Sequence, residues 1–297
     1  MNKATVALVA CAAIGFGTPA APADAAPTFG EYVALGDSWA ADATLNPDRT
    51  TEEFVPLGCA QSRGNYAKQV AAALEVPVFR DASCGGAVTD DMTGSQGAQR
   101  GMPLWSNPPQ FDRLSPATDL VTILIGGNDA GLAAAVATCL TVDPTAAPCV
   151  GSFVANGVDR MSANIAAAEP KVAAAVQGIR AQAPRARILL LNYFKSVGTE
   201  GGCFPAVPIS DADARWLGGK LIELNTMLAR VAEATGVQLV DTYATSDGHD
   251  ACQAPGVRWA EGLVPFTSDP VGPAVPFHPN QLGADHQARS VLAAVGR

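Results

Sequence analysis

Short apolar segments alternate with helix-like segments along most of the chain, and this alternation limits the folds open to it. The clearest apolar segment, 119–125, reads as a buried strand because it is short, almost wholly apolar and followed by two glycines. Strands that alternate with helices predict a parallel sheet covered on both faces, and right-handed crossovers make it doubly wound α/β. The expected strands lie at 32–35, 76–79, 119–125, 187–191 and 237–240, and the expected helices at 65–74, 153–183 (split or kinked at Pro170), 211–234 and 281–295.

The first 26 residues have the features of an export signal. Lys3 is the only charge before an apolar run from Ala4 to about Phe16, and Ala23-Asp24-Ala25 forms a small-x-small cleavage pattern. We therefore expect a signal peptide at 1–26 and one domain at 27–297, secreted and without integral membrane contact. The alternative is a lipoprotein acylated at Cys11, which follows Leu8-Val9-Ala10.

Charge and cysteine content narrow the classes of partner and compartment. The formal net charge of −9 argues against nucleic acid, whose phosphates select basic surfaces. Removal of Cys11 would leave six cysteines, and an even number in an exported chain predicts disulfides rather than a metal site. Six cysteines allow fifteen pairings. Sequential pairing closes the shortest loops and is preferred: Cys59–Cys84, Cys139–Cys149 and Cys203–Cys252.

Ser38 is the first candidate for chemistry. The apolar run Tyr32-Val33-Ala34-Leu35 leads directly into Gly36-Asp37-Ser38. Ligand sites of open α/β sheets lie at the carboxyl ends of the strands, so a serine at this point is placed where a nucleophile is useful. Ser38 could equally cap the following segment, since serine and aspartate commonly begin helices.

A nucleophilic serine needs a base within hydrogen-bond reach, and the chain has three histidines. His278 is the best candidate because it lies on a stiff, proline-bounded loop that leads into the last expected helix. His249 lies close to Cys252, in a setting that suggests a structural role. His286 lies within the expected last helix and is interpreted as a surface residue.

Two further segments could donate hydrogen bonds to a negatively charged intermediate. Asn128 follows the strand at 119–125 through Gly126 and Gly127, which places its carboxamide at the same sheet edge as Ser38. The glycines of Gly85-Gly86-Ala87 let backbone N–H groups approach a ligand closely. Both segments could also be ordinary turns.

Taken in order, these segments resemble the four conserved blocks of the SGNH (GDSL-like) hydrolase superfamily. The blocks are Gly36-Asp37-Ser38, Gly86, Gly126-Gly127-Asn128-Asp129 and His278-Pro279-Asn280, and they extend across nearly the whole mature chain. The six cysteines and the segment 248–252 are similar to those of the secreted actinobacterial esterase/lipase branch.

The resemblance carries expectations about fold and chemistry. It implies a flavodoxin-like three-layer α/β/α sandwich with five parallel strands, three sequential disulfides, and ester hydrolysis without a metal or organic cofactor. It implies Ser38 as nucleophile and His278 as general base, with the Ser38 N–H, the Gly86 N–H and the Asn128 side chain forming the oxyanion hole. A small ester or lipid is the implied substrate; the oligomeric state is not indicated.

One position departs from the superfamily pattern. Most members have an aspartate three residues before the histidine, and this chain has Val275 there. The secreted branch includes enzymes that use a backbone carbonyl from this position, so we expect the Val275 carbonyl to accept the His278 Nδ1–H. Asp247 or Asp269 could instead supply a carboxylate through the fold.

The expected function is therefore that of a secreted serine esterase or lipase that works through an acyl-enzyme on a Ser38–His278 dyad. A polysaccharide deacetylase of the same fold and a non-catalytic secreted binding protein are the alternatives. Aromatic residues in expected loops could form an acyl pocket or only pack beneath the loops: Phe54, Trp105, Phe111, Trp259 and Phe266.

Overall fold

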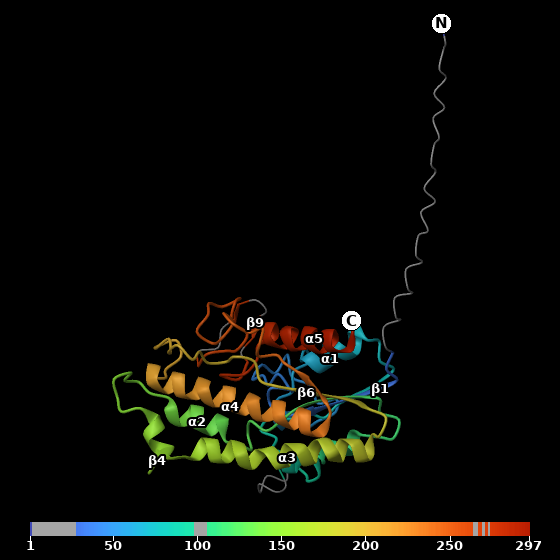
Figure 1. Cartoon of the computed structure of the whole chain (residues 1–297), viewed down its shortest axis with the longest axis horizontal. Helices are drawn as coiled ribbons and strands as arrows, with labels where there is room; N and C mark the ends of the chain where they lie inside the picture. The colour runs from blue at the N-terminus through green and yellow to red at the C-terminus, as the bar shows by residue number, and fades with distance from the viewer. Residues whose placement is uncertain (2–27, 98–105, 264–266, 269–270, 273) are drawn as a thin grey trace.

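A five-stranded parallel sheet forms the centre of the molecule (Figure 1). The computed structural model describes residues 1, 28–97, 106–263, 267–268, 271–272 and 274–297. The strand order is β2-β1-β3-β6-β7, the order of flavodoxin-like sheets, which confirms the expected fold class. The strands are β1 (Glu31–Gly36), β2 (Val78–Asp81), β3 (Leu120–Leu124), β6 (Arg187–Leu191) and β7 (Gln238–Val240).

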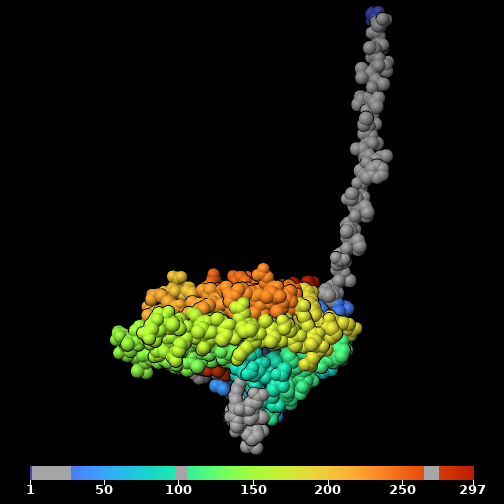
Figure 2. All heavy atoms as spheres, turned by 60° about the horizontal axis from the view of Figure 1, so that its bottom comes forward, coloured from blue at the N-terminus to red at the C-terminus, as the bar shows by residue number. Residues whose placement is uncertain are grey.

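Helices cover both faces of this sheet. In Figure 1, α1 (Tyr66–Ala73) and α5 (Gln281–Val295) lie above the strands, and α2 (Leu132–Cys139), α3 (Arg160–Gln182) and α4 (Asp211–Thr235) lie below them. Figure 2 shows α3 and α4 side by side across the lower face. β1 and β3 are buried along their whole length, which explains why both read as continuous apolar runs.

Smaller elements lie in the connections. Among the described residues they are the hairpins β4 (Val154–Ala155) with β5 (Val158–Asp159) and β8 (Thr267–Ser268) with β9 (Val271–Gly272), and short 3-10 helices at Leu57–Cys59, Thr89–Met92, Gln110–Arg113 and Cys149–Ser152. Within the described ranges, no helix is both long enough and apolar enough to cross a membrane.

Local capping decides where the helices begin. The Asn65 side chain accepts the Lys68 N–H at 3.1 Å, so α1 begins at Tyr66 as the sequence predicted. The prediction for the helix at 153–183 was wrong at its start, because Asp159 caps α3 at Arg160 and a hairpin occupies the preceding residues. Pro170 does not split α3, which continues as one helix of 23 residues.

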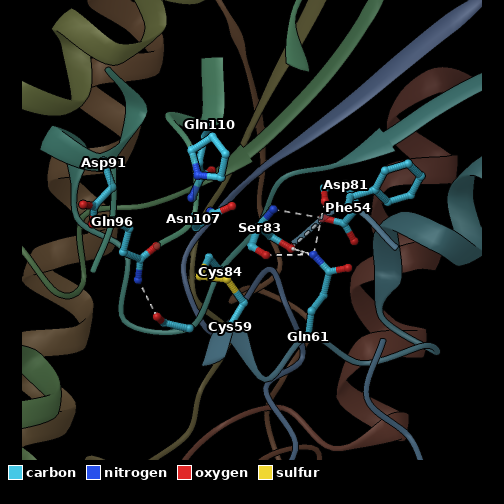
Figure 3. The surroundings of a disulfide bond; sticks show 12 residues. Phe54, Cys59, Gln61, Asp81, Ser83, Cys84, Asp91, Gln96, Asn107 and Gln110 are labelled. Atoms are coloured by element: carbon cyan, nitrogen blue, oxygen red, sulfur yellow. Dashed lines mark hydrogen bonds between the residues drawn. A yellow bond between two sulfur atoms is a disulfide. The ribbon is translucent and has the colours of Figure 1, made fainter. Parts of the chain in front are cut away.

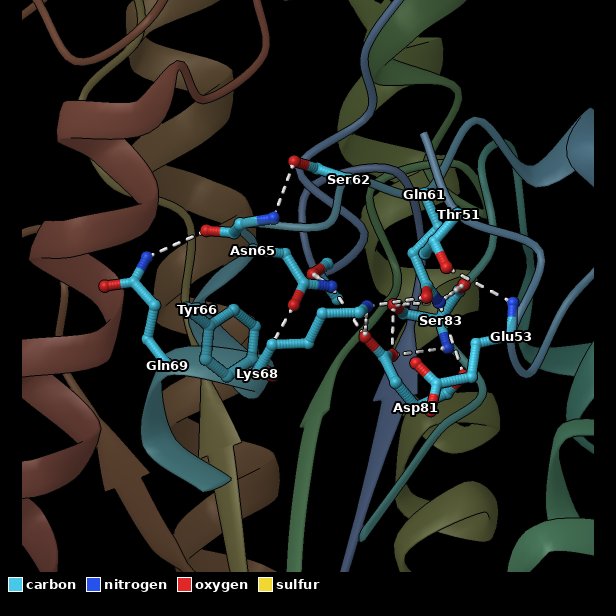
Figure 4. Close-up of polar contacts among 12 residues, drawn as sticks. Thr51, Glu53, Gln61, Ser62, Asn65, Tyr66, Lys68, Gln69, Asp81 and Ser83 are labelled. Carbon is cyan, nitrogen blue, oxygen red and sulfur yellow. Dashed lines mark hydrogen bonds and ion pairs between the residues drawn. The ribbon is translucent and has the colours of Figure 1, made fainter. Parts of the chain in front are cut away.

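A buried polar cluster joins the end of β2 to the start of α1 (Figure 4). The Asp81 carboxylate is fully buried and accepts the Lys68 ammonium at 2.7 Å, the Asn65 amide at 2.6 Å and the Ser83 hydroxyl at 2.6 Å. Lys68 also donates to the Gln61 side chain at 2.7 Å. A buried charge is tolerated only when paired and hydrogen-bonded, and this cluster provides both.

We expect Lys68→Met to lower the free energy of unfolding by about 3 kcal/mol, because it leaves the buried Asp81 charge without its counterion. Lys171→Met is the matched control. The Lys171 side chain is half exposed and lies 4.0 Å from Asp129 Oδ1, and the buried Asp129 carboxylate also accepts the Thr89 N–H and hydroxyl, so loss of Lys171 should cost less than about 1 kcal/mol. Urea unfolding of both variants checks the difference. Equal losses would mean that Asn65 and Ser83 satisfy the carboxylate without the lysine.

Candidate active site

The turn that carries Ser38 depends on Gly36 at the end of β1. Gly36 has a φ of +146°, and a Cβ atom there would lie 2.4 Å from the Leu124 carbonyl oxygen of the adjacent strand. The Gln110 side chain holds both backbone groups of Gly36, accepting its N–H at 2.8 Å and donating to its carbonyl at 2.9 Å. The Asp37 N–H then donates to Leu124 O at 3.0 Å. The chain therefore turns sharply at the sheet edge and places Ser38 just beyond it.

His278 lies directly against Ser38, although 240 residues separate the two in sequence. Its Nε2 is 2.7 Å from the Ser38 Oγ. The loop of His278 is held by backbone pairing with Glu261, which accepts the Phe277 N–H at 2.8 Å and donates to His278 O at 3.0 Å. Phe277 takes a φ of +61°, which is uncommon for a residue with a bulky side chain. This conformation persists because backbone bonds on both sides fix it.

A buried ion pair supports this loop from beneath. The Arg258 guanidinium donates to the Glu261 carboxylate at 2.6 Å, and both side chains are almost wholly buried. The Asn280 side chain donates to the same carboxylate at 2.9 Å and to the Arg258 carbonyl at 2.8 Å, while its own oxygen caps α5. The segments before and after His278 are thus fixed to one network.

The carbonyl that faces His278 Nδ1 belongs to Pro276, at 2.8 Å, so the prediction of Val275 was wrong by one residue. The Val275 carbonyl instead accepts the backbone N–H of His278 at 3.1 Å, in a turn that leaves Pro276 O beside the imidazole. Asp247 does not supply a carboxylate, because it is largely exposed and paired with Lys195. Asp269 lies outside the described residues.

Burial lowers the pKa of His278 below its ordinary value of 6.5, and the bond to the Pro276 carbonyl opposes this shift only in part. The imidazole is therefore neutral at neutral pH. With Nδ1–H donating to Pro276, Nε2 carries the lone pair and accepts from the Ser38 hydroxyl. This is the tautomer that a general base requires.

The structure brings the two expected donor segments together. Asn128 Nδ2 donates to the Ala87 carbonyl at 2.9 Å, and Asn128 lines the same cavity as Ser38 and His278. A carboxamide has two N–H donors, so one is fixed by Ala87 and the other can be directed at a ligand. Gly86 has a φ of +74°, and it immediately precedes Ala87, the residue whose carbonyl the Asn128 side chain binds.

Figure 3 shows how this glycine turn is held. The Cys59–Cys84 disulfide precedes it, the Gly85 N–H donates to Cys59 O at 2.9 Å, and Gln96 donates to Gly85 O at 2.7 Å. The other disulfides are Cys139–Cys149 and Cys203–Cys252, so all six cysteines pair in the sequential order that the sequence favoured.

The other two histidines have structural contacts. His249 stacks on Trp259 at 3.8 Å and its Nδ1 lies 2.7 Å from the Val257 carbonyl oxygen. The interpretation of His286 as a surface residue was wrong. It is buried, its ring stacks on Trp259 with the ring centroids 4.1 Å apart, and its Nε2 lies 2.9 Å from Thr242 O. Residues of α5 that face the sheet are buried, and His286 is one of them.

An apolar cavity of about 240 Å³ opens beside Ser38 and His278. One face of α2 forms much of its wall, since residues spaced three or four apart on a helix share a face. Phe54, Phe111 and Trp259 do not line it, and Trp105 and Phe266 lie outside the described residues. The apolar lining includes Trp39, Leu132, Ala133, Val136, Ala137, Leu140, Leu263 and Phe277.

Across the residues that the structure describes, one group of potential metal ligands has its atoms within 4.8 Å of one another: Cys139, Cys149 and Asp213. The disulfide uses both of its thiols, so this group does not present the thiolates that bind metal.

Two residues at the site had no role in the sequence analysis beyond the strand-end motif. Asp37 is buried and accepts the Trp39 N–H at 2.9 Å and the Tyr193 hydroxyl at 2.5 Å. Burial raises the pKa of Asp37 to about 7, against the effect of these bonds. Tyr193 is itself fully buried and follows β6. Its position just past the carboxyl end of a strand is the signal that could have marked it.

Known proteins resemble the chain in sequence and in fold. The model of the GDSL-like Lipase/Acylhydrolase family matches residues 34–286. Lipase 2 of Streptomyces coelicolor is 36% identical over 99% of this chain and 96% of its own length. An esterase of Streptomyces scabiei is 28% identical over 98% and 92%.

Solved structures agree on the fold. The extracellular lipase of Streptomyces rimosus superposes with a TM-score of 0.64 at 24% identity, covering 89% of this chain and 99% of that one. Phospholipase A1 of Streptomyces albidoflavus gives a TM-score of 0.64 at 23% identity, covering 90% and 99%. With the family model matched over most of its length and a full-length relative at 36% identity, the chain belongs to the GDSL-like lipase/acylhydrolase family.

Proposed function

We propose that this protein is a secreted serine carboxyl-ester hydrolase that forms an acyl-enzyme on Ser38. The observation that carries the proposal is the 2.7 Å contact between Ser38 Oγ and His278 Nε2 at the mouth of an apolar cavity. A serine hydroxyl is a weak nucleophile until a positioned base accepts its proton, and this contact has the length that such a transfer requires.

In the proposed reaction, Ser38 Oγ attacks the ester carbonyl carbon while His278 Nε2 takes the hydroxyl proton. The carbonyl oxygen becomes an oxyanion that accepts from the Ser38 N–H, the second Asn128 N–H and the Gly86 N–H. Collapse of this intermediate breaks the bond to the alkoxy oxygen, which leaves as the alcohol with the proton from His278. Water then repeats the sequence on the acyl-enzyme and releases the acid.

The acceptor of His278 Nδ1–H distinguishes this dyad from a serine–histidine–aspartate triad. A neutral carbonyl stabilises imidazolium less than a carboxylate does. The Pro276 carbonyl therefore serves mainly to fix the ring orientation and tautomer, and the donors around the oxyanion supply most of the charge stabilisation.

The cavity favours an ester with an apolar acyl chain, and the names lipase and esterase of the relatives agree with this class. An acetyl group would fill little of a cavity of about 240 Å³, so the polysaccharide deacetylase alternative has no support from its shape. A non-catalytic binding protein would have no need of the aligned serine, histidine and asparagine.

Secretion is supported by the three disulfides, which persist in oxidising compartments, and by the extracellular lipase among the similar structures. Apart from Met1, the expected signal peptide at 1–26, including Cys11 of the lipoprotein alternative, lies outside the described residues.

Ser38→Ala should abolish turnover of p-nitrophenyl butyrate while the folded protein keeps its melting temperature. The reason is that the Ser38 hydroxyl is the side-chain group found hydrogen-bonded to His278 Nε2 among the residues that the structure describes. A phosphonate ester should add its mass to the Ser38 peptide of the wild type and to no peptide of the variant. Retention of full activity by a folded Ser38→Ala protein would remove the proposed mechanism.

The acid limb of kcat/KM against pH should lie below 6.5, the ordinary pKa of histidine. His278 must be neutral to act as base, and its lowered pKa means that protonation occurs only at lower pH. Activity should therefore persist as pH falls through 6.5 and decline below it. A pH–rate profile with a poor, non-sticky ester checks this. An apparent pKa above 7 would contradict a buried, carbonyl-bound imidazole.

Ala137→Phe should lower kcat/KM for octanoyl esters by about tenfold or more and change that for acetyl esters by less than about threefold. A helix rises about 1.5 Å per residue, so Ala137 lies about 7.5 Å farther along the cavity wall than Leu132. Ala134→Phe is the control, because Ala134 is exposed on α2 and does not line this cavity. A panel of p-nitrophenyl esters measures the selectivity. Equal losses on all chain lengths would place the acyl chain elsewhere.

A further inference from the structure

The Tyr193 hydroxyl joins the two turns that carry the proposed oxyanion donors. It donates to Asp37 Oδ2 at 2.5 Å, and it accepts the Gly127 N–H at 2.9 Å. Asp37 immediately precedes Ser38 in the turn after β1, and Gly127 immediately precedes Asn128 in the turn after β3. One phenolic oxygen thus binds both turns, one residue away from each donor-bearing residue.

The second glycine of the Gly126-Gly127 pair has a physical reason in this contact. A Cβ atom at Gly127 would lie 2.9 Å from the Tyr193 hydroxyl oxygen and 3.1 Å from the ring carbon that bears it. Any side chain at position 127 would therefore push the hydroxyl away from the turn. Glycine is needed at position 127 because the phenol approaches the backbone closely there, and not because the backbone adopts an unusual φ angle.

Tyr193 is itself held firmly from the opposite side. The Asn225 side chain on α4 accepts the Tyr193 N–H at 3.0 Å and donates to its carbonyl at 2.7 Å. The ring is 1% exposed and packs edge-on against Trp39 at 5.3 Å. Because its backbone, ring and hydroxyl are all held in place, Tyr193 can fix the distance between the two turns that its hydroxyl binds.

The carboxylate that Tyr193 binds controls the nucleophile turn. Asp37 Oδ1 accepts the Trp39 N–H at 2.9 Å, so the Asp37 side chain bridges Ser38 and stabilises the turn that carries it. Tyr193 holds the other carboxylate oxygen. If that bond were lost, the buried carboxylate would keep only its backbone donors, Trp39 and Ala40, and nothing would tie the turn after β1 to Tyr193.

We propose that Tyr193 is a positioning residue, whose hydroxyl sets the distance between the Ser38 and Asn128 turns so that their donors converge on one oxyanion. The inference rests on the proposed function, because it assigns Tyr193 a part in transition-state binding at that site. Donors that stabilise an oxyanion act through their fixed geometry, and a displacement of about 1 Å can cost 10²-fold in rate.

Tyr193→Phe tests the inference, because it removes the hydroxyl and keeps the ring. We expect kcat for p-nitrophenyl butyrate to fall by about 10- to 100-fold, with KM changed by less than about threefold. The Ki of an alkylboronic acid, which forms a tetrahedral anionic adduct with serine, should rise by the same factor as kcat/KM falls. A loss of packing alone would not link these two quantities.

Tyr66→Phe is the matched control. Tyr66 is also fully buried, and its hydroxyl donates to the Thr122 side chain at 3.0 Å, away from the donor-bearing turns. This variant should lose a comparable amount of thermal stability and keep the kcat and boronate Ki of the wild type.

Gly127→Ala is a second, independent variant that displaces the Tyr193 hydroxyl sterically, and it should show the same pattern of kcat loss with KM preserved. Wild-type kcat and Ki in a folded Tyr193→Phe protein would overturn the inference. So would a variant that loses its near-UV circular dichroism along with its activity, because the hydroxyl would then hold the fold and not the spacing. Failure of the wild type to hydrolyse esters would instead contradict the proposed function itself, and that outcome is distinct from a failure confined to the role of Tyr193.

Discussion

The parallel pairing of β1, β3 and β6 is the constraint on which the whole site depends. Parallel strands end at the same edge of a sheet, so the residues after each strand become neighbours. Ser38 follows β1, Asn128 follows β3 and Tyr193 follows β6, and these three strands are adjacent. Neighbouring strands lie about 4.8 Å apart, so a tyrosine beyond β6 can reach across the end of β3 to the end of β1. The sheet sets the coarse spacing, and the Tyr193 hydrogen bonds refine it.

His278 reaches the site by a different route, because no strand end carries it. Its loop depends on backbone bonds to Glu261 and on the buried Arg258–Glu261 pair. The Val275 N–H also donates to the Ala43 carbonyl at 3.0 Å, and the Ala43 N–H donates to Ser38 O at 3.0 Å. The loop of His278 is thus connected to Ser38 by a short path of two backbone hydrogen bonds. This direct connection explains how a loop can hold the ring within 2.7 Å of Ser38 Oγ.

The sequence was informative where local chemistry decides the structure. Strands β1, β3, β6 and β7, the capping of α1 by Asn65 and the bounds of α5 follow from apolar runs and caps, whereas the strand expected at 76–79 lies two residues later, at Val78–Asp81. The GDS, GGND and HPN segments predicted which residues meet. It was uninformative where a long-range contact decides. The Pro276 carbonyl faces His278 Nδ1 because the Val275 carbonyl already accepts the His278 backbone N–H within the turn. The burial of His286 depends on how α5 packs against the rest of the fold. The cavity wall comes from α2, a segment too short and too alanine-rich to mark itself as a binding surface.

The distribution of carboxylates explains why donor geometry matters so much here. A triad places a negative charge behind the histidine, and this chain places a neutral carbonyl there. The Asp37 carboxyl group lies instead on the Ser38 side of the site, where a negative charge would oppose the oxyanion of the proposed reaction. Burial reduces that opposition because it favours the neutral acid and raises the pKa of Asp37 to about 7. The bond from Tyr193 favours the carboxylate, but its hydroxyl hydrogen offsets part of the negative charge. In the proposed mechanism the base side therefore gives little help, so the transition state would be stabilised mainly by a few N–H donors, whose value depends on their being fixed before the substrate arrives.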